Sequence, residues 1–401
     1  MRVLVADEFS DLHIRELEAH GFDVDYDPRC SADDLASEGR IGEADILIVR
    51  STRVTRAAID GARRLALVVR AGAGVDTIDV DAASDRGIRV SNCPGKNAAA
   101  VAELAMGLIL ALDRRIPDAT FDLRAGRWNK KEYSQADGLK GKALGIVGLG
   151  RVGSELAKRA RAFEMRVAAW SVPLRPERVD SLRIGAYANL EDLVEQSDVV
   201  SVHLPQAAAT RRLFDAAVFA RMKPHTIFVN TSRGAIVDEA DLVAAMQEKH
   251  LRVGLDVFDP EPAEGVAAFR PALVDAGSFV GTPHIGASTA QSQNAIAAEA
   301  VRICLEFSKT GAAPNTVNIE ENAPAECQLV VRHYDRVGVL ASVLAVLRTH
   351  GVNVEEMSNA IFRGAKTAVA TIRLSKAPGP VVVAEITALK DAVISAEVKR
   401  V

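Results

Sequence analysis

Short apolar runs alternate with amphipathic stretches over the first three quarters of the chain. The runs at residues 3–6, 45–50, 65–71 and 88–92 are typical of buried strands, and residues 98–113 have helical spacing. This alternation predicts an α/β fold with doubly wound parallel sheets.

A second series of strands opens at a glycine-rich turn. An apolar strand is predicted at residues 143–147, the turn occupies residues 148–153, and residues 154–163 have helical spacing. A strand, a glycine turn and a helix start form a pyrophosphate site, because the glycines admit the ligand and the helix start supplies free N–H groups. The predicted cofactor-binding residues of the turn are Gly148, Gly150, Arg151, Val152 and Gly153. Further strands are expected at 166–171, 198–204, 226–231, 252–258 and 278–282, with a helix over 290–309.

The composition changes after this series. Residues 311–324 are polar, contain helix and strand breakers such as proline and asparagine, and lack periodicity, which indicates a linker. Beyond it, a strand at 327–334, a helix at 337–350, a hairpin of 352–362 with 366–375, a helix at 381–392 and a strand at 393–401 are predicted. This βαββαβ order is ferredoxin-like and predicts a separate small domain.

Composition limits the classes of function. A chain of 401 residues is expected to form two or three domains, and 48% hydrophobic residues with a net charge of −4 are ordinary for a globular protein. The charge predicts no nucleic-acid partner, and no apolar run or leader points to a membrane or to export. The cysteines lie far apart without zinc spacing, so we expect reduced thiols in a cytoplasmic enzyme and no metal site. They are Cys30, Cys93, Cys304 and Cys327.

Polar residues follow three of the later strands, where α/β enzymes place their sites. Arg233 follows the strand at 226–231, Glu261 lies between two prolines, and His284 follows the strand at 278–282. A guanidinium grips a carboxylate in a bidentate manner, a histidine exchanges a proton near neutral pH, and a glutamate fixes its tautomer. Each residue alone also fits a structural role, but their shared position favours oxidation of a 2-hydroxy acid with a nicotinamide.

Several motifs together identify a family. They lie at 47–51, 70–76, 100–104, 126–128, 148–153, 230–234, 255–258, 261–262 and 283–289. With them the whole chain resembles the D-isomer-specific 2-hydroxyacid dehydrogenases, most closely the branch that oxidises 3-phosphoglycerate at the start of L-serine biosynthesis. The resemblance implies that Arg233 binds the substrate carboxylate and polarises the carbonyl, His284 is the acid/base, and Glu261 is its partner.

The resemblance also implies domain boundaries and further site residues. A substrate-binding domain would comprise residues 1–97 and 288–320, a dinucleotide-binding Rossmann domain 98–287, and a regulatory domain 325–401. The substrate would also meet Arg50, Arg70, Gly72, Ala73 and Gly74, although the two arginines fit structural ion pairs equally well. The cofactor would also be lined by His203, Leu204, Pro205, Thr231, Ser232, Arg233, Asp256, His284 and Gly286.

One position departs from the family and leaves the cofactor open. Ser171 lies 18 residues after Gly153, where the family usually has an aspartate that holds the adenosine ribose and repels a 2′-phosphate. Serine does neither strongly, and Arg175 follows four residues later. Two alternatives therefore stay open: the enzyme uses NADP, or it uses NAD with a serine in place of the usual aspartate. The biosynthetic resemblance favours NAD.

The C-terminal segment resembles an ACT domain, a small amino-acid-sensing module that pairs across a dimer. The resemblance implies a serine effector held by His333, Asp335 and Asn353, although Asp335 replaces an asparagine and Val337 a proline. A domain that only dimerises is the alternative. Either way, a homodimer or homotetramer acting on a small-molecule substrate is expected.

Two other functions stay open. Ser171 would also suit a glyoxylate, hydroxypyruvate or other 2-hydroxyacid reductase. A non-catalytic, nicotinamide-binding regulatory protein is a candidate of a different class, because the same fold occurs in transcriptional corepressors. The presence of Arg233, Glu261 and His284 argues against it.

Overall fold

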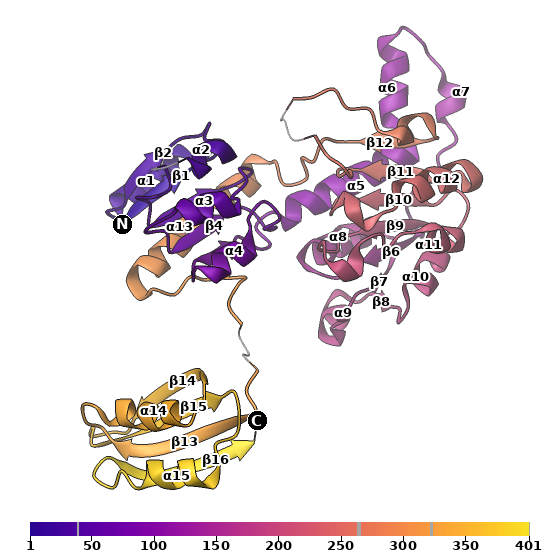
Figure 1. The fold of residues 1–401 in the computed structure, drawn as a ribbon. Coiled ribbons are helices and arrows are strands. Elements are labelled where there is room, and N and C mark those ends of the chain that lie inside the picture. Colours follow the sequence, from indigo (N-terminus) through magenta and orange to yellow (C-terminus); the bar gives the residue numbers. More distant parts are fainter. Residues whose placement is uncertain (38–39, 263–265, 321–323, 401) are drawn as a thin grey trace. The chain divides into compact units, whose positions relative to one another are not determined.

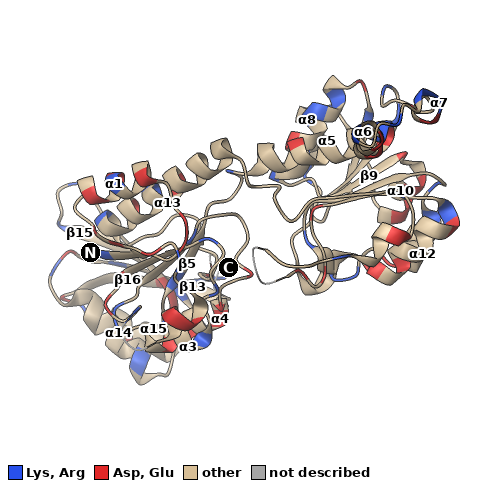
Figure 2. Cartoon of the chain, turned by 90° about the horizontal axis from the view of Figure 1, so that it is seen from above, with Lys and Arg blue, Asp and Glu red and all other residues tan. Residues whose placement is uncertain are grey.

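A computed structural model describes residues 1–37, 40–262, 266–320 and 324–400 (Figure 1). The chain divides into two compact units, Met1–Asn318 and Ile319–Val401. Basic and acidic residues both occur along the helices of the cartoon in Figure 2. In the part of the chain that is described, every helix is too short or too polar to cross a membrane.

A parallel sheet forms the amino-terminal part of the first unit. Its elements are β1 (Arg2–Val5), α1 (Asp11–Ala19), β2 (Asp23–Tyr26), α2 (Ala32–Ala36), β3 (Ile46–Val49), α3 (Arg56–Gly61), β4 (Leu67–Arg70), α4 (Val80–Asp85) and β5 (Arg89–Asn92). Among the described residues the strand order is β2-β1-β3-β4-β5. Val3 and Val5 face a core with Leu17 of α1, whereas Leu4 faces a core with Ile59 of α3. Because both faces are covered, the inner strands are almost wholly apolar.

A helix from much later in the chain covers one face of this sheet. The helix α13 (Ala290–Thr310) contributes Ile296 and Ile303 to the core that contains Val3. The chain then runs beside β5, where Val317 N–H donates to the Val90 carbonyl over 2.8 Å. The part of the predicted linker that meets β5 is therefore fixed to the first unit, and residues 321–323 of that linker lie outside the described residues. The three-domain division stays a prediction.

A second, larger parallel sheet completes the first unit. Its elements are α5 (Ala98–Arg114), α6 (Ile116–Arg124), α7 (Lys130–Tyr133), β6 (Ala143–Val147), α8 (Arg151–Ala162), β7 (Arg166–Trp170), α9 (Pro176–Leu182), β8 (Gly185–Ala186), α10 (Leu190–Gln196), β9 (Val199–Val202), α11 (Ala216–Arg221), β10 (Ile227–Asn230), α12 (Glu239–Lys249), β11 (Arg252–Leu255) and β12 (Phe279–Gly281). Short 3-10 turns occupy Ala208–Thr210, Gly234–Ile236 and Ala272–Asp275. The described strands lie in the order β12-β11-β10-β9-β6-β7-β8.

The strand order of this sheet fixes where a ligand binds. The chain proceeds from β6 to β7 on one side and returns to β9 on the other, so the order reverses between β6 and β9. Helices α5, α8 and α9 cover one face of the sheet, and α10, α11 and α12 cover the other. In such sheets ligands bind outside the carboxyl ends of the strands at the point of reversal.

The second unit contains an antiparallel sheet with two helices. Its elements are β13 (Cys327–Tyr334), α14 (Val339–Thr349), β14 (Val354–Ile361), β15 (Thr367–Leu374), α15 (Pro380–Thr387) and β16 (Val393–Arg400). The described strands lie in the order β14-β15-β13-β16. Residues such as Leu329, Ile372 and Leu374 pack on Val343 of α14 and Ile386 of α15.

The structure confirms the α/β class, the parallel sheets and an additional carboxyl-terminal antiparallel sheet. It corrects some element bounds. The helix predicted over 381–392 ends at Thr387, because a tight turn in which Ala392 N–H donates to the Leu389 carbonyl (2.8 Å) leads into β16. The strands β2 and β8 were not predicted, since one is mostly polar and the other has two exposed residues. Val401, the end of the last predicted strand, lies outside the described residues.

Candidate active site

The glycine turn has the geometry that a pyrophosphate site requires. Gly148 follows β6 with φ of 101°, and a Cβ there would lie 2.5 Å from the His203 carbonyl oxygen. A Cβ on Gly153 would collide with the Gly148 carbonyl oxygen and lie 3.0 Å from Ile146. Gly150 is the N-cap of α8 and faces open space, so it leaves the helix start accessible. The turn therefore combines a tight bend, close helix packing and an exposed helix amino end.

Buried polar atoms without partners line the same edge of the sheet. In the part of the chain that is described, Thr231 Oγ1 and His203 Nδ1 are buried and accept or donate no hydrogen bond. His203 Nε2 lies 2.9 Å from Ser201 Oγ, and burial lowers the pKa of His203 to about 3, so the imidazole is neutral. Unpaired buried polar groups are costly unless a ligand pairs with them. These atoms and the glycine turn fit a bound dinucleotide.

Other predicted cofactor residues lie directly after strands of the same sheet or at the start of α8. Leu204 and Pro205 follow β9, and the Arg151 side chain donates to the Pro94 carbonyl. Ser171 directly follows β7 and is partly buried. Behind the turn, Arg178 Nη1 donates to the Leu149 carbonyl over 2.8 Å.

His284 and Glu261 form a pair at the carboxyl edge of the sheet. His284 Nδ1 lies 2.7 Å from Glu261 Oε2, and Phe258 N–H donates to Glu261 Oε1 over 3.1 Å. Burial acts to raise the pKa of Glu261, but the hydrogen bond and charge of His284 and the Phe258 amide hold this pKa below its usual value. An ionised Glu261 accepts a hydrogen bond from Nδ1–H of His284, and in that tautomer Nε2 is the proton acceptor. The His284 side chain is 48% exposed and is therefore accessible to a substrate.

Asp256 anchors the loop that carries His284. This carboxylate is buried, and it accepts hydrogen bonds from Thr282 Oγ1 (2.6 Å), Ile285 N–H (2.8 Å) and Gly286 N–H (2.9 Å). His284 N–H also donates to the Asp256 carbonyl over 2.8 Å and adopts a φ of 50°. A Cβ on Gly286 would lie 2.9 Å from Asp256 Oδ2. Asp256 thus fixes the His284 backbone, and its predicted cofactor contact stays a prediction.

Arg233 leaves β10 through a turn that Asn230 organises. Asn230 Oδ1 accepts from Ser232 N–H (2.9 Å) and Ser232 Oγ (2.7 Å), and Asn230 Nδ2 donates to the Arg233 carbonyl (2.9 Å). The Arg233 guanidinium pairs with Asp76, at 2.8 Å from Nη2 to Oδ2. Asp76 is the last residue of the 70–76 motif, but no local pattern indicates that it pairs with a residue 157 positions away.

The predicted substrate residues of the smaller sheet lie near Arg233. Arg70 ends β4, its Nε is buried without a partner among the described residues, and a Cβ on Gly72 would collide with its guanidinium. Burial lowers the pKa of Arg70, and the charges of Arg233 and Arg50 lower it further. The loop over residues 72–74 is held by Asn92, whose Nδ2 donates to the Ala73 carbonyl over 2.6 Å. Arg70 and Arg233 therefore lie beside the 72–74 loop, and Arg50 is near enough for its charge to act on Arg70.

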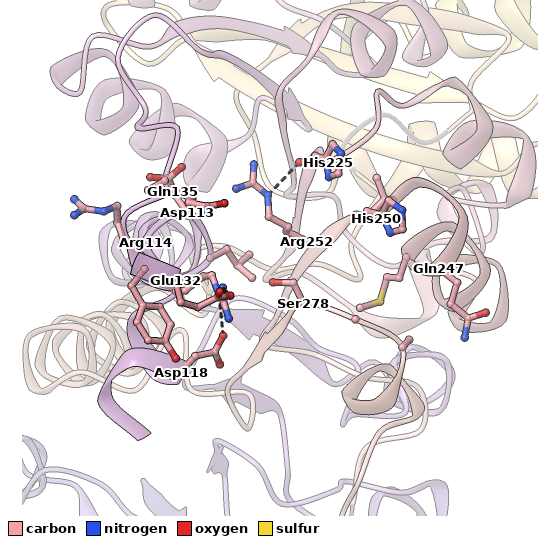
Figure 3. Close-up of a pocket in the computed structure, with 18 residues that line it drawn as sticks. Asp113, Arg114, Asp118, Glu132, Gln135, His225, Gln247, His250, Arg252 and Ser278 are labelled. Carbon is pink, nitrogen blue, oxygen red and sulfur yellow. Dashed lines mark hydrogen bonds and ion pairs between the residues drawn. The ribbon is translucent and has the colours of Figure 1, made fainter. Parts of the chain in front are cut away.

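A separate cavity lies at the amino ends of strands of the larger sheet, opposite the carboxyl ends that carry the candidate site. It has a volume of about 790 Å³ and is lined by residues of α5, α6, α7 and α12 together with residues that precede or start strands, such as His225, Arg252 and Ser278 (Figure 3). In Figure 3, Arg252 donates to the His225 carbonyl, at 3.1 Å. None of the predicted site residues lies among its lining in the described chain. The chemistry at the carboxyl ends of the strands, rather than this cavity, identifies the candidate active site.

In the second unit the three predicted effector residues do not meet within one chain. His333 is buried near the end of β13, with Nε2 3.1 Å from Asn359 Oδ1 and Nδ1 2.8 Å from the Tyr334 carbonyl. Asp335 N–H donates to the Lys366 carbonyl near the same end, over 3.1 Å. Asn353 precedes β14, and its N–H donates to Ser375 Oγ (3.3 Å). The strand register places Asn353 at the opposite end of the sheet, about 20 Å from His333.

The fold and these contacts agree with the comparisons with known proteins. Residues 106–286 match the family model described as "D-isomer specific 2-hydroxyacid dehydrogenase, NAD binding domain". A hydroxypyruvate reductase of Thermotoga maritima is 43% identical over 263 residues, which cover 65% of this chain and 84% of that protein. The chain therefore belongs to the D-isomer specific 2-hydroxyacid dehydrogenases, a family of nicotinamide-dependent enzymes.

Relatives named D-3-phosphoglycerate dehydrogenase cover more of the chain. The protein of Methanocaldococcus jannaschii is 38% identical over 331 residues, covering 81% of this chain and 61% of that protein. A solved structure of NAD⁺-bound 3-phosphoglycerate dehydrogenase from Entamoeba histolytica superposes with a TM-score of 0.66 at 27% identity, covering 80% of this chain and 99% of that one. The chain spans less than two thirds of the length of the M. jannaschii relative.

Proposed function

We propose that the chain is an NAD-dependent dehydrogenase that oxidises 3-phospho-D-glycerate to 3-phosphohydroxypyruvate, the first step of L-serine biosynthesis. The observation that carries the proposal is the 2.7 Å pair of His284 and Glu261 at the sheet edge that also holds Arg233 and the glycine turn. Several relatives named D-3-phosphoglycerate dehydrogenase support the substrate. Arg50 and Arg70 supply further positive charge for a phosphate group.

Each residue of the proposed site has a distinct task in the reaction. Arg233 binds the substrate carboxylate and thereby orients the C2 hydroxyl toward His284. Nε2 of His284 takes the hydroxyl proton as the C2–H bond breaks, and Glu261 stabilises the resulting imidazolium. In the reverse direction His284 returns that proton to the carbonyl oxygen. When bound, the nicotinamide supplies the acceptor for the hydride that leaves C2.

We propose NAD as the cofactor, held by the glycine turn with Thr231 and His203 among its neighbours. The match of residues 106–286 to an NAD-binding domain supports this choice. NADP is the second candidate, because Ser171 provides no carboxylate to repel a 2′-phosphate and Arg175 lies close in sequence. A kcat/KM for NAD at least 10-fold above that for NADP would exclude NADP as the working cofactor.

A substrate panel tests the proposed activity. Oxidation of 3-phosphoglycerate and reduction of phosphohydroxypyruvate, glyoxylate and hydroxypyruvate would be measured with both nicotinamides. We expect the highest kcat/KM with the phosphorylated pair. A preference for glyoxylate or hydroxypyruvate would favour a reductase, which the Thermotoga maritima relative supports. Absence of turnover with every 2-keto acid, together with intact NADH binding, would favour a non-catalytic regulatory protein.

The second unit is proposed to be an ACT domain that binds serine and inhibits the enzyme. Its βαββαβ order and antiparallel sheet support this assignment. Because His333 and Asn353 lie at opposite ends of the sheet, a site that uses both requires a second copy of the chain. A unit that only dimerises would bind no serine.

We propose that the working molecule is a homodimer or homotetramer of cytoplasmic location. Large apolar side chains of the segment over residues 116–128 are exposed, including Phe121 at 68% and Trp128 at 81%, and a second copy would cover them. The thiols of Cys30, Cys93, Cys304 and Cys327 are buried and free, which suits a reducing compartment.

A further inference from the structure

Asp76 forms an ion pair with Arg233 that joins the two parallel sheets of the first unit. Asp76 lies in the segment that follows β4, and Arg233 follows β10. Asp76 Oδ2 accepts from Arg233 Nε over 3.0 Å and from Nη2 over 2.8 Å. Their side chains are 50% and 30% exposed, so the pair borders a space that solvent and substrate can reach.

The pair uses only one edge of the guanidinium. Arginine has five N–H donors, of which Nε–H and one Nη2–H point to Asp76. One Nη1–H donates to the Ser232 carbonyl over 2.7 Å. Among the described residues, the other N–H on Nη1 and the other on Nη2 make no hydrogen bond. Two N–H groups on neighbouring nitrogens of a guanidinium match the spacing of the two oxygens of a carboxylate. The ion pair therefore orients Arg233 without occupying the edge that would hold the substrate.

The surrounding backbone is shaped around this pair. A Cβ on Gly74 would lie 2.9 Å from Asp76 Oδ2 and would collide with Arg233 Nη2. Only glycine at residue 74 therefore lets the two side chains meet as they do.

Asp76 also separates two like charges. Burial is the largest cause of the lowered pKa of Arg70, the charge of Arg233 lowers it further, and the charge of Asp76 acts against both. Without this carboxylate, Arg70 and Arg233 would repel each other across a partly buried space.

We propose that Asp76 is a positioning residue: it holds Arg233 in the orientation from which the end of the guanidinium grips the substrate carboxylate. This inference rests on the proposed function. It assigns to Asp76 no contact with the substrate and no proton transfer.

The test compares Asp76→Ala, Asp76→Asn and a matched control in the full chain. The control is Asp85→Ala, which removes an exposed carboxylate that likewise accepts two guanidinium N–H groups, both from Arg56 over 3.1 Å. We expect Asp76→Ala to lose at least 30-fold in kcat/KM, since a small misplacement of an orienting group has a large effect on rate. Asp76→Asn keeps an oxygen that accepts from Arg233 and should retain kcat/KM within about 10-fold. All three variants should bind NADH with the wild-type Kd within 2-fold.

A second measurement, the Kd of a dicarboxylate that is not turned over, tests carboxylate binding directly. Oxalate is titrated into each protein–NADH complex and followed by NADH fluorescence. Asp76→Ala should weaken oxalate binding at least 10-fold, whereas Asp85→Ala should leave it unchanged.

The outcomes separate this inference from the proposed function. An Asp76→Ala variant within 3-fold of wild type in kcat/KM and oxalate Kd would overturn the positioning role alone. So would equal losses in Asp76→Ala and Asp76→Asn accompanied by a lowered Tm and weaker NADH binding, because that pattern marks a structural ion pair. If wild type neither turns over a 2-hydroxy acid nor binds oxalate, the proposed function fails first and the inference falls with it.

Discussion

In the proposed site, the two residues that would act on the substrate, His284 and Arg233, are held in position by neighbouring side chains. His284 is oriented on one side by Glu261 and fixed in its backbone by Asp256, a buried carboxylate with three hydrogen bonds to the 282–286 loop. Arg233 is held in a similar manner by Asn230 and Asp76. Such supporting contacts set the tautomer and direction of the groups that meet the substrate.

Replacing Glu261 with glutamine tests the His284 partnership. The amide still pairs with Nδ1, but it no longer favours a protonated imidazole through its charge. We expect Glu261→Gln to lower kcat/KM for oxidation at neutral pH by about 10- to 100-fold. Stopped-flow or steady-state rates measure this loss, and a kcat/KM equal to that of wild type would contradict the assignment.

The buried His203 predicts how stability depends on pH. Burial lowers its pKa to about 3, from 6.5 in the unfolded chain. Between pH 6.5 and 3, the unfolded state therefore binds a proton that the native state does not bind. Above pH 6.5 this histidine therefore does not reduce the free energy of unfolding. As the pH drops toward 3, proton binding to the unfolded state lowers that free energy by at most about 1.4 kcal/mol per pH unit. We expect the Tm to fall between pH 7 and 5, and to fall less in His203→Gln. His225→Gln, a change at an exposed histidine, should leave the wild-type trend, and an identical trend in His203→Gln would contradict the argument.

At the scale of elements, different glycines of the β6–turn–α8 unit serve the packing of the fold and the binding of the ligand. Gly153 lies against the Gly148 carbonyl and Ile146, whereas Gly150 has open space around its Cα. The two glycines therefore serve packing and ligand approach respectively, although the same motif contains both.

Alanine at each position distinguishes these two roles. Gly153→Ala should lower stability by about 1–3 kcal/mol, because the added methyl overpacks the strand–helix contact. Gly150→Ala should leave the Tm within about 1 °C yet raise the NADH Kd at least 10-fold. Gly107→Ala, in an open and exposed position of α5, should leave NADH binding unchanged and stabilise slightly. Thermal melts and fluorescence titrations measure this pattern, and equal NADH affinity in Gly150→Ala and wild type would refute the assigned turn.

At the scale of the whole molecule, the two units share no sheet and no hydrophobic core among the described residues: the first has two parallel sheets and the second one antiparallel sheet. The proposed regulation therefore needs chains to associate, since one copy of the second unit offers His333 and Asn353 at opposite ends of the sheet. In the proposed oligomer, the exposed side chains of Phe121 and Trp128 in the first unit would be covered by a second copy.

Mixed oligomers test whether the serine site is shared between copies. Neither His333→Ala nor Asn353→Ala alone should bind serine in calorimetry or be inhibited by it. Co-refolded mixtures of the two variants should regain part of the inhibition, because a mixed dimer has one site with both residues intact. Light scattering confirms the oligomeric state of each sample. No recovery in verified mixed dimers, or no effect of millimolar serine on wild type, would exclude the shared site.

The sequence by itself determined the alternation of strands and helices, the glycine turn, and the three polar residues that follow strand ends. These are local properties: apolar periodicity, backbone freedom at Gly148 and the residue types of Arg233, Glu261 and His284 are all visible within a few positions. The short edge strands β2 and β8 escaped prediction because little burial marks them.

Only the tertiary structure decided which distant residues meet. The strand order brings Gly148 beside His203, folds α13 back onto the first sheet and joins Asp76 to Arg233 across 157 positions. It also assigned both oxygens of Asp256 to the His284 loop and separated His333 from Asn353. Pairings of this kind depend on sheet order and register, which no local pattern encodes, because many arrangements bury the same apolar faces equally well.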